Sequence, residues 1–215
     1  MDKVNISIIN RRNIKSGRLV KLIPEFYELK KVVENSPWHD REAVFDHTLS
    51  VFCSLEKIIR NSKRGIRQAL NKIVDKNSRK SLLYVATLLH DIGKTETITD
   101  LGGGVRGCPG HERKGALKTE KILKRFSLSQ KESKIIIDMV RNHGVIHDII
   151  GLGCKDFQKE YKNFKKKFSS IYVELILLAF ADTVGSYLKR ANPLEFRHRI
   201  DFYKKELNNL PPGLW

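Results

Sequence analysis

The chain of 215 residues contains only three cysteines, Cys53, Cys108 and Cys154, and no two of them form a C-x-x-C pair. An odd number of cysteines without such a pair does not build a disulfide framework and agrees with a reducing compartment. No apolar run approaches the roughly 20 residues that cross a bilayer, and no N-terminal signal peptide is recognisable. We therefore expect a cytoplasmic protein without a transmembrane segment.

The sequence also lacks stretches in which apolar and polar residues alternate, and it has neither internal repeats nor low-complexity tracts. Alternation with a period of two is the signal of a half-buried strand, whereas apolar residues three and four positions apart recur along this chain. We therefore predict an all-α fold. A chain of this length with 40% hydrophobic residues suits one domain with one core.

Acidic residues are scarce relative to basic ones, with 24 Asp and Glu against 41 Lys and Arg, which gives a formal net charge of +17. A field of this sign favours polyanions such as nucleic acid, nucleotides and anionic membrane surfaces. The basic residues are spread along the chain, so a lysine-rich composition with solvated charged faces explains the same balance. Nucleic-acid binding is thus compatible with the composition but is not selected by it.

Helical spacing of apolar residues organises most of the chain. Ser129 and Glu132 form the pattern of a capping box, and Ser36-Pro37 marks a boundary because the residue before proline avoids the helical region. We expect an N-terminal extension with a short helix (1–36), a main domain (37–190), and a C-terminal helix and tail packed on it (191–215). The expected helices span 24–33, 41–60, 66–74, 78–89, 112–126, 129–143, 156–168, 172–188 and 192–207, with a long flexible loop at 95–110.

One apolar stretch ends abruptly in polar residues, at Leu88-Leu89-His90-Asp91-Ile92-Gly93-Lys94. The preceding helix is apolar on most sides and therefore buried, so His90 and Asp91 need partners. A divalent cation satisfies both, although a core histidine bonded to its neighbouring acid is the simpler explanation for an isolated pair. We expect Gly93 to end the helix as a C-terminal cap and Lys94 to lie at the mouth of the site, where it holds an anion.

Polar residues also interrupt the apolar faces of other helices. His47 falls on the inner face of 41–60, His143 ends the apolar stripe of 129–143, and Asp182 is the one charge in the middle of 172–188. Buried carboxylates are rarely left ionised and unpaired. The candidate ligands of one or two divalent ions (Mn, Fe, Co, Ni, Mg or Zn) are His47, His90, Asp91, His111, His143 and Asp182.

The order His47, His90-Asp91, Asp182 resembles the HD superfamily of metal-dependent phosphohydrolases, and His90-Asp91-Ile92-Gly93-Lys94 looks like the extended form of its name-giving motif. Trp38-His39, followed after seven residues by His47-Thr48-Leu49, and Gly110-His111-Glu112 are similar to blocks in the HD domain of bacterial tRNA nucleotidyltransferases and poly(A) polymerases. Asp40 and Arg41 depart from the family's pattern, which leaves open whether His39 takes part in the site. No nucleotidyltransferase carboxylate pair precedes this region, so polymerising activity is not expected.

The resemblance implies an HD-domain helical bundle whose internal mono- or binuclear metal site hydrolyses phosphate esters by means of a metal-activated water. It implies that His47, His90, Asp91 and Asp182 hold one ion and that Asp91 bridges to a second ion held by His111 and His143. If only the first four bind, the site is mononuclear, and His111 and His143 are phosphate contacts or core residues. Two ions bridged by one carboxylate would use all six side chains.

Under this interpretation the substrate is a nucleotide, another phosphorylated small molecule or an RNA end, cleaved by a phosphodiesterase or phosphatase. Two alternatives stay open, namely a nucleic-acid-binding module with a structural metal site and a di-iron oxygenase on the same scaffold. For His147 and His198 we expect surface or satisfied core positions. The candidate catalytic residues are Asp91 and Lys94, and the candidate substrate contacts are Lys94, Arg106, Arg113 and Lys114. For the last three, solvated loop charges are the favoured explanation.

Overall fold

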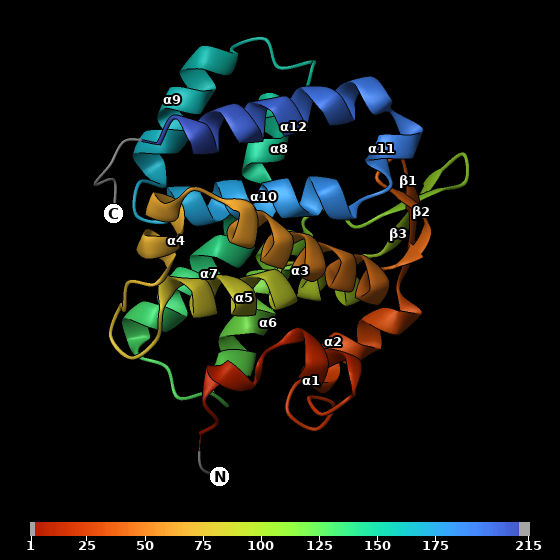
Figure 1. Cartoon of the computed structure of the whole chain (residues 1–215). Helices are drawn as coiled ribbons and strands as arrows, with labels where there is room; N and C mark the ends of the chain where they lie inside the picture. Colours follow the sequence, from red (N-terminus) through yellow and green to blue (C-terminus); the bar gives the residue numbers. More distant parts are fainter. Residues whose placement is uncertain (1–2, 211–215) are drawn as a thin grey trace.

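Helix α10 (Tyr172–Gly185) lies at the centre of the molecule because its sequence is apolar on nearly every side and almost all of it is buried. In the computed structural model, which describes residues 3–210, α10 packs most extensively against α3 (Val44–Asn61). The two helices approach closely at Gly185, where an added Cβ would lie 2.8 Å from the Val51 amide nitrogen. On the other side of α10 lies α12 (Pro193–Asn208), so the central helix is covered from both sides (Figure 1).

A second group of helices packs beside α3 and carries the rest of the core. Helix α5 (Arg79–Leu89) contacts both α3 and α7 (Gln130–Asn142), and α6 (His111–Leu123) packs against α7 and the 3-10 helix η3 (Ile92–Glu96). The shorter helices are η1 (Ile6–Ile8), α1 (Arg11–Lys15), α2 (Pro24–Glu28), η2 (Leu29–Lys31), α4 (Arg64–Leu70), α8 (Val145–Ile150), α9 (Phe157–Lys167) and α11 (Leu188–Ala191).

The ends of the chain contribute to the same core as its middle. Ile14, Ile23 and Phe26 of the N-terminal segment are fully buried, and Tyr203 of α12 is buried against the opposite side of the bundle. Residues 1–2 and 211–215, parts of the expected N-terminal extension and C-terminal tail, lie outside the described residues. In the part of the chain that the structure covers, no helix combines the length and apolar character needed to cross a bilayer.

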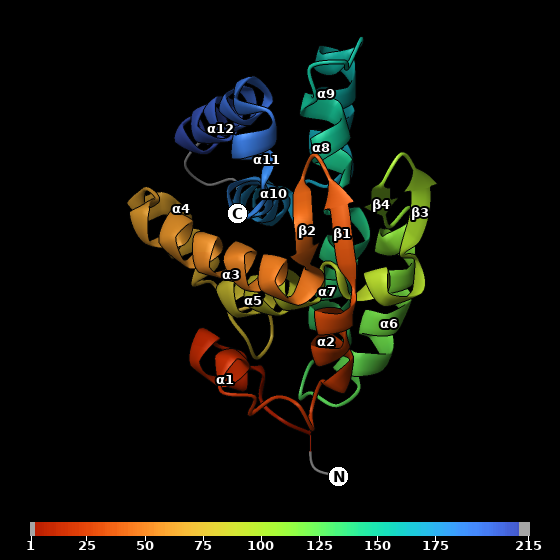
Figure 2. The ribbon, with the colours of Figure 1, turned by 90° about the vertical axis from the view of Figure 1, so that its right-hand side faces the viewer.

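The all-α fold class is confirmed, but the structure also contains a small antiparallel sheet that was not predicted, with the strand order β2-β1-β4-β3. The strands span three to five residues and are mostly exposed or half-buried, so they leave no alternating pattern. The sheet lies at the right-hand side of the helical bundle in Figure 1, and Figure 2 shows this side facing the viewer. Its strands are β1 (Val33–Ser36), β2 (His39–Ala43), β3 (Thr99–Gly102) and β4 (Val105–Gly107).

The sheet changes the interpretation of two segments. Residues 95–110, expected to be a long flexible loop, contain the end of η3 and the β3–β4 hairpin, whose turn is made by Gly102, Gly103 and Gly104 at positive φ. The expected helix at 24–33 is shorter, because the chain turns through η2 into β1. β1 pairs with β4 through Asn35 and Arg106, so the N-terminal segment and the hairpin form one wall beside the candidate site.

Candidate metal centre

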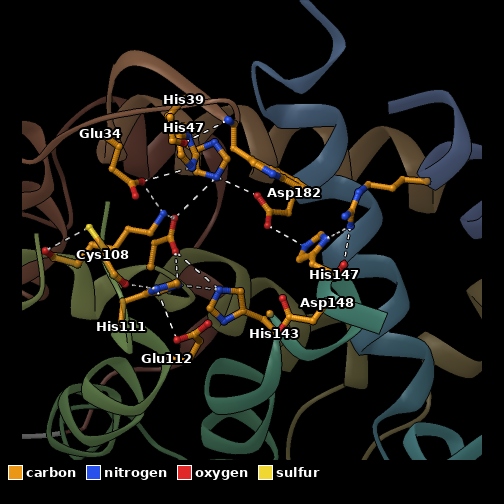
Figure 3. A pocket seen from close by; sticks show the side chains of 16 residues that line it. Glu34, His39, His47, Cys108, His111, Glu112, His143, His147, Asp148 and Asp182 are labelled. Carbon is orange, nitrogen blue, oxygen red and sulfur yellow. Dashed lines mark hydrogen bonds and ion pairs between the residues drawn. The ribbon is translucent and has the colours of Figure 1, made fainter. Parts of the chain in front are cut away.

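Asp91 lies at the junction of two groups of imidazoles, one facing each of its carboxylate oxygens. Its Oδ2 atom lies 3.3 Å from Nε2 of His90 and 3.7 Å from Nε2 of His47. Its Oδ1 atom lies 3.2 Å from Nε2 of His111 and 3.7 Å from Nε2 of His143. Figure 3 shows His47, His111 and His143 pointing toward one another from different parts of the chain. A single carboxylate thus joins two clusters of potential metal ligands.

Asp182 completes the first cluster from the opposite side. Its Oδ1 atom lies 2.9 Å from Nε2 of His47, and its Oδ2 atom lies 3.1 Å from Nε2 of His147 on α8 (Figure 3). His147 was expected on the surface or in a satisfied core position, yet it lines the same cavity as the other imidazoles. The spacing of four residues between His143 and His147 was a signal for this placement, because it brings both to one side of a helical segment.

Three imidazoles are oriented by the same contact between Nδ1 and a backbone carbonyl oxygen. Each directs Nδ1 at the carbonyl oxygen three residues earlier in the chain, at a distance of 2.8 Å. When Nδ1 donates its hydrogen there, Nε2 presents a lone pair to the centre, which is the form that binds a metal. The three pairs are His90 with Thr87, His111 with Cys108, and His143 with Val140.

The pKa shifts of the histidines and of Asp91 also favour binding of a cation. Burial, together with the nearby imidazoles of His90 and His111, lowers the pKa of His143 to about 3. Burial likewise lowers the pKa of His47. Burial opposes ionisation of Asp91, but the charges of His90 and Lys94 outweigh it and hold the pKa of this carboxyl well below its ordinary value. Burial also opposes protonation of His90 and His111, but the Asp91 carboxylate outweighs it and raises the pKa of both. The centre therefore combines neutral imidazoles at His47 and His143 with an ionised carboxylate, and a bound cation would displace the protons of His90 and His111.

Several buried polar atoms at the centre are left unsatisfied by the protein. Within the described residues, neither Nε2 of His90 nor Oδ2 of Asp91 has a hydrogen-bond partner, although Nζ of Lys94 lies 2.9 Å from Oδ2. A buried polar atom without a partner costs about 1–3 kcal/mol, which a bound cation would offset. Within residues 3–210, His47, His90 and Asp91 form one group of potential ligand atoms within 4.8 Å of one another, and Asp91, His111 and His143 form another. These nitrogen and oxygen donors fit one or two divalent cations of borderline or hard character.

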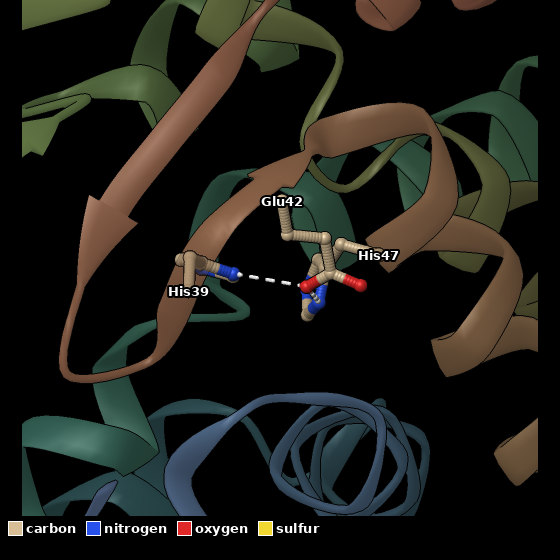
Figure 4. A group of neighbouring side chains, drawn as sticks. All are labelled: His39, Glu42 and His47. Carbon is tan, nitrogen blue, oxygen red and sulfur yellow. Dashed lines mark ion pairs between the residues drawn. The ribbon is translucent and has the colours of Figure 1, made fainter.

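His39 lies beside the centre, and its two ring nitrogens face two glutamates that also contact residues of the centre. Oε2 of Glu42 lies 3.6 Å from Nδ1 of His39 and 3.7 Å from Nδ1 of His47 (Figure 4). Nε2 of His39 lies 3.3 Å from Oε2 of Glu34. Nε2 of His47 faces Asp91 and Asp182, whereas its buried Nδ1 faces Glu42 at a distance too long for a hydrogen bond. Glu42 is thus the carboxylate next to the far side of the His47 ring.

Lys94 lies deeper than expected. Its Nζ atom lies 2.9 Å from Oδ2 of Asp91 and 2.6 Å from Oε2 of Glu34, and the residue is buried, although it still lines the cavity. Burial disfavours the ammonium, but the two carboxylates outweigh it and raise the lysine pKa. The prediction that Lys94 stands at the mouth of the site was therefore wrong, because a buried pair of carboxylates holds it inside.

The cavity around the centre has a volume of about 280 Å³. Arg106, Arg113 and Lys114 are exposed and are not among its lining residues, whereas Arg199, which the sequence did not single out, is one of them. Cys108 also lines it, but burial and the nearby Glu34 charge raise the pKa of its thiol to about 12, so it stays protonated. Trp38, Glu112 and Asp148 line it as well.

Gly93 has a different role from the expected one. Helix α5 ends at Leu89, and Gly93 lies within η3 with no positive φ. An added Cβ would collide with the carbonyl oxygen of His111 and with the backbone of Gly115. The absence of a side chain at Gly93 thus lets α6 lie directly on η3, which brings His111 to Asp91.

A family model described as the HD domain matches residues 44–185, well over half of the chain. The chain therefore belongs to the HD domain family, and the resemblance drawn from the His-Asp pair is confirmed. It is 28% identical over 136 residues to a bifunctional uridylyltransferase/uridylyl-removing enzyme of Stutzerimonas stutzeri (strain A1501), and 29% identical over 140 residues to a protein of the same name from Cereibacter sphaeroides. The narrower resemblance to tRNA nucleotidyltransferases stays a prediction.

These alignments cover 63% and 65% of this chain but only 14% of each relative. The chain thus spans a small part of the length of the curated relatives that it matches.

Proposed function

We propose that this protein is a divalent-metal-dependent phosphohydrolase that cleaves a phosphate ester of a nucleotide or an RNA end, as a phosphodiesterase or phosphatase. The observation that carries the proposal is Asp91, which directs one carboxylate oxygen at each of two imidazole groups. Two cations about 3.5–4 Å apart and bridged by one carboxylate are typical of phosphate-ester hydrolysis. The uridylyl-removing relatives, whose name describes removal of a nucleotidyl group, support a substrate of this class.

Cations in such a centre lower the pKa of water toward neutrality and offset the negative charge that develops on the phosphoryl oxygens. His47, His90, Asp91 and Asp182 would hold one ion, and Asp91, His111 and His143 would hold the other. Lys94 keeps Oδ2 of Asp91 in place through an ion pair of 2.9 Å and adds a fixed positive charge beside the reacting group.

The cavity supports a metal-dependent mode of phosphate binding. Its two lining cations, Lys94 and Arg199, are already paired with carboxylates, Lys94 with Asp91 and Glu34 and Arg199 with Glu195 at 2.6 Å. Phosphate therefore has to be bound mainly by divalent ions rather than by free basic side chains. A cavity of about 280 Å³ suits a mononucleotide or the end of a chain, and the net charge of +17 favours an anionic substrate such as RNA.

The test is elemental analysis of metal-loaded protein followed by an activity screen over 2′,3′-cyclic nucleotides, mononucleotides and short RNAs. We expect hydrolysis that a chelator abolishes and that returned metal restores. His90→Ala should lose both metal and turnover. The control is His198→Ala, because Nε2 of His198 lies 3.0 Å from the Ile150 carbonyl oxygen and His198 does not line the cavity.

Two results would overturn the proposal. If metal removal lowered the melting temperature but no phosphate ester were hydrolysed in any metal form, the centre would be structural, as in a nucleic-acid-binding module. If the loaded protein contained a mixed-valent iron pair, consumed oxygen and released no phosphate, it would be an oxygenase.

A further inference from the structure

Beyond the metal centre, the wall of the cavity carries a tryptophan that lies outside the hydrophobic core. Trp38 lies between β1 and β2, is partly exposed and lines the cavity. In the described part of the chain it belongs neither to the hydrophobic core nor to the apolar residues packed against that core. A large aromatic ring that faces a polar cavity instead of the core needs another reason to be there.

Trp38 is close to the candidate ligands. Its ring centroid lies 5.0 Å from that of His147, with the ring planes at 72°. Nε2 of His147 lies 3.1 Å from Oδ2 of Asp182, whose other oxygen faces His47. One side chain therefore separates the indole from a proposed metal ligand, and both line the same cavity.

The indole is also held rigidly. The guanidinium carbon of Arg199 lies 4.9 Å from the ring centroid, and Arg199 is fixed by its bond to Glu195 and by donation of Nη1 to the His147 carbonyl oxygen at 2.9 Å. The Trp38 carbonyl oxygen accepts a hydrogen bond of 2.8 Å from the Tyr187 amide. A ring that is fixed in advance by its neighbours loses little conformational entropy when a ligand stacks on it.

We propose that Trp38 is the stacking surface for the nucleobase of the substrate, so that the cavity selects nucleotides over phosphate esters that lack a base. The inference rests on the proposed function, because it takes the phosphate to bind at the metal centre and the nucleobase to bind at Trp38 beside it. Every nucleobase has a flat π face, so the surface provides affinity for bases in general. Selection among bases would require other groups.

The test compares uridine 5′-monophosphate with ribose 5-phosphate as substrates of the metal-loaded protein. We expect Trp38→Ala to raise KM for the nucleotide by roughly five- to a hundredfold with little change in kcat, and to leave ribose 5-phosphate hydrolysis unchanged. Trp38→Phe, which keeps an aromatic face, should recover most of the affinity. Phe157→Ala removes another partly exposed ring, outside the cavity, and should change neither substrate.

A second measurement does not depend on turnover. The chain has two tryptophans, so Trp215→Phe leaves Trp38 as the only one. We expect uridine 5′-monophosphate to quench its fluorescence and ribose 5-phosphate to leave it unchanged.

The outcomes separate this inference from the proposed function. Equal losses on both substrates in Trp38→Ala, or no quenching by the nucleotide, would overturn the stacking role while phosphohydrolase activity stands. Quenching by the nucleotide without hydrolysis of any ester would contradict the proposed function and keep the base-binding surface.

Discussion

Nε2 of His47 on α3 lies 2.9 Å from Oδ1 of Asp182 on α10, although the two residues come from distant parts of the chain. These two helices form the most extensive contact between elements of the fold, and both side chains enter the centre from their shared interface. The position of the site is therefore set by the packing of the core itself. Changes that disturb this packing should act on metal binding as well as on stability.

Gly93→Ala tests the close approach of α6 to η3. The added methyl group would collide with backbone atoms of His111 and Gly115, so α6 has to move away. We expect a loss of about 1–3 kcal/mol in the free energy of unfolding, together with weaker metal binding as His111 withdraws from Asp91. Urea denaturation and metal titration measure the two effects.

Gly65→Ala provides the matched control. Gly65 lies in α4, its added Cβ would meet no atom within 4 Å, and its φ is not positive. Alanine there should raise stability by about 0.5–1 kcal/mol. If Gly93→Ala were as stable and as metal-competent as Gly65→Ala, the close approach would not be what positions His111.

Glu132→Gln tests a buried carboxylate far from the centre. One oxygen of Glu132 accepts hydrogen bonds from the amides of Lys76 and Asn77 at 2.8 and 2.6 Å, and the other accepts from the amide of Ser129 at 2.9 Å. Burial opposes ionisation, but these hydrogen bonds lower the pKa below its ordinary 4.5. In the variant, the side-chain NH2 group of Gln would face the backbone N–H of Ser129, so two donors would meet without an acceptor. We expect this to lower the free energy of unfolding by about 1–3 kcal/mol at pH 7.

The sign of the pH dependence follows from the lowered pKa. A carboxylate whose pKa is depressed by folding stabilises the protein above its unfolded pKa, and this contribution is lost as the pH falls through the folded pKa. The difference between wild type and Glu132→Gln should therefore shrink below pH 4.5 in urea denaturation. Glu120→Gln, which changes an exposed carboxylate on α6, should show no such difference.

Glu42→Gln tests whether this carboxylate supports His47 from behind. Loss of an outer carboxylate that orients a ligand histidine typically weakens metal binding by about 10- to 100-fold. We expect that loss in a calorimetric titration, while the melting temperature of the metal-free protein stays nearly unchanged. Asp46→Asn removes the same charge from an exposed position next to His47. An equal loss of affinity in both variants would mean that general electrostatics, rather than contact with the ring, is responsible.

Lys94→Met removes the buried ammonium and keeps the length of the side chain. We expect metal to be retained and turnover to fall by about 10²- to 10³-fold, as when one electrostatic contact to a developing charge is removed. Stability should also fall, because Glu34 loses the cation that lies 2.6 Å away. The double variant Lys94→Met/Glu34→Gln should recover stability without recovering turnover. Recovered turnover would show that Lys94 has only a structural role.

Helical periodicity was enough to place the inner part of the site. His47 and Asp182 interrupt apolar helix faces, and a period of 3.6 residues determines which positions point inward. The helices that carry these residues were predicted for the same reason, as was the capping box of Ser129 and Glu132 that opens α7.

The outer part of the site could not be predicted in this way. Glu34 and Glu42 lie on strands of four and five residues that are partly exposed, so no periodic pattern marks them. Gly93 follows a predicted helix, which is typical of a cap. Its actual role depends on a close contact with α6, which is a tertiary feature that the sequence pattern does not show. Arg199 reaches the cavity only because α12 packs across α10.

In the proposed centre Asp91 would be a ligand of two metal ions, one held with His47, His90 and Asp182 and the other with His111 and His143. Elemental analysis and phosphate release, measured on the same metal-loaded samples of wild type and Asp91→Ala, test it most directly, with the exposed cavity-wall variant Asp148→Ala as control. The account predicts close to two ions per chain in wild type and in the control, and loss of both metal and turnover in Asp91→Ala. Full hydrolysis by Asp91→Ala with its metal retained would contradict it.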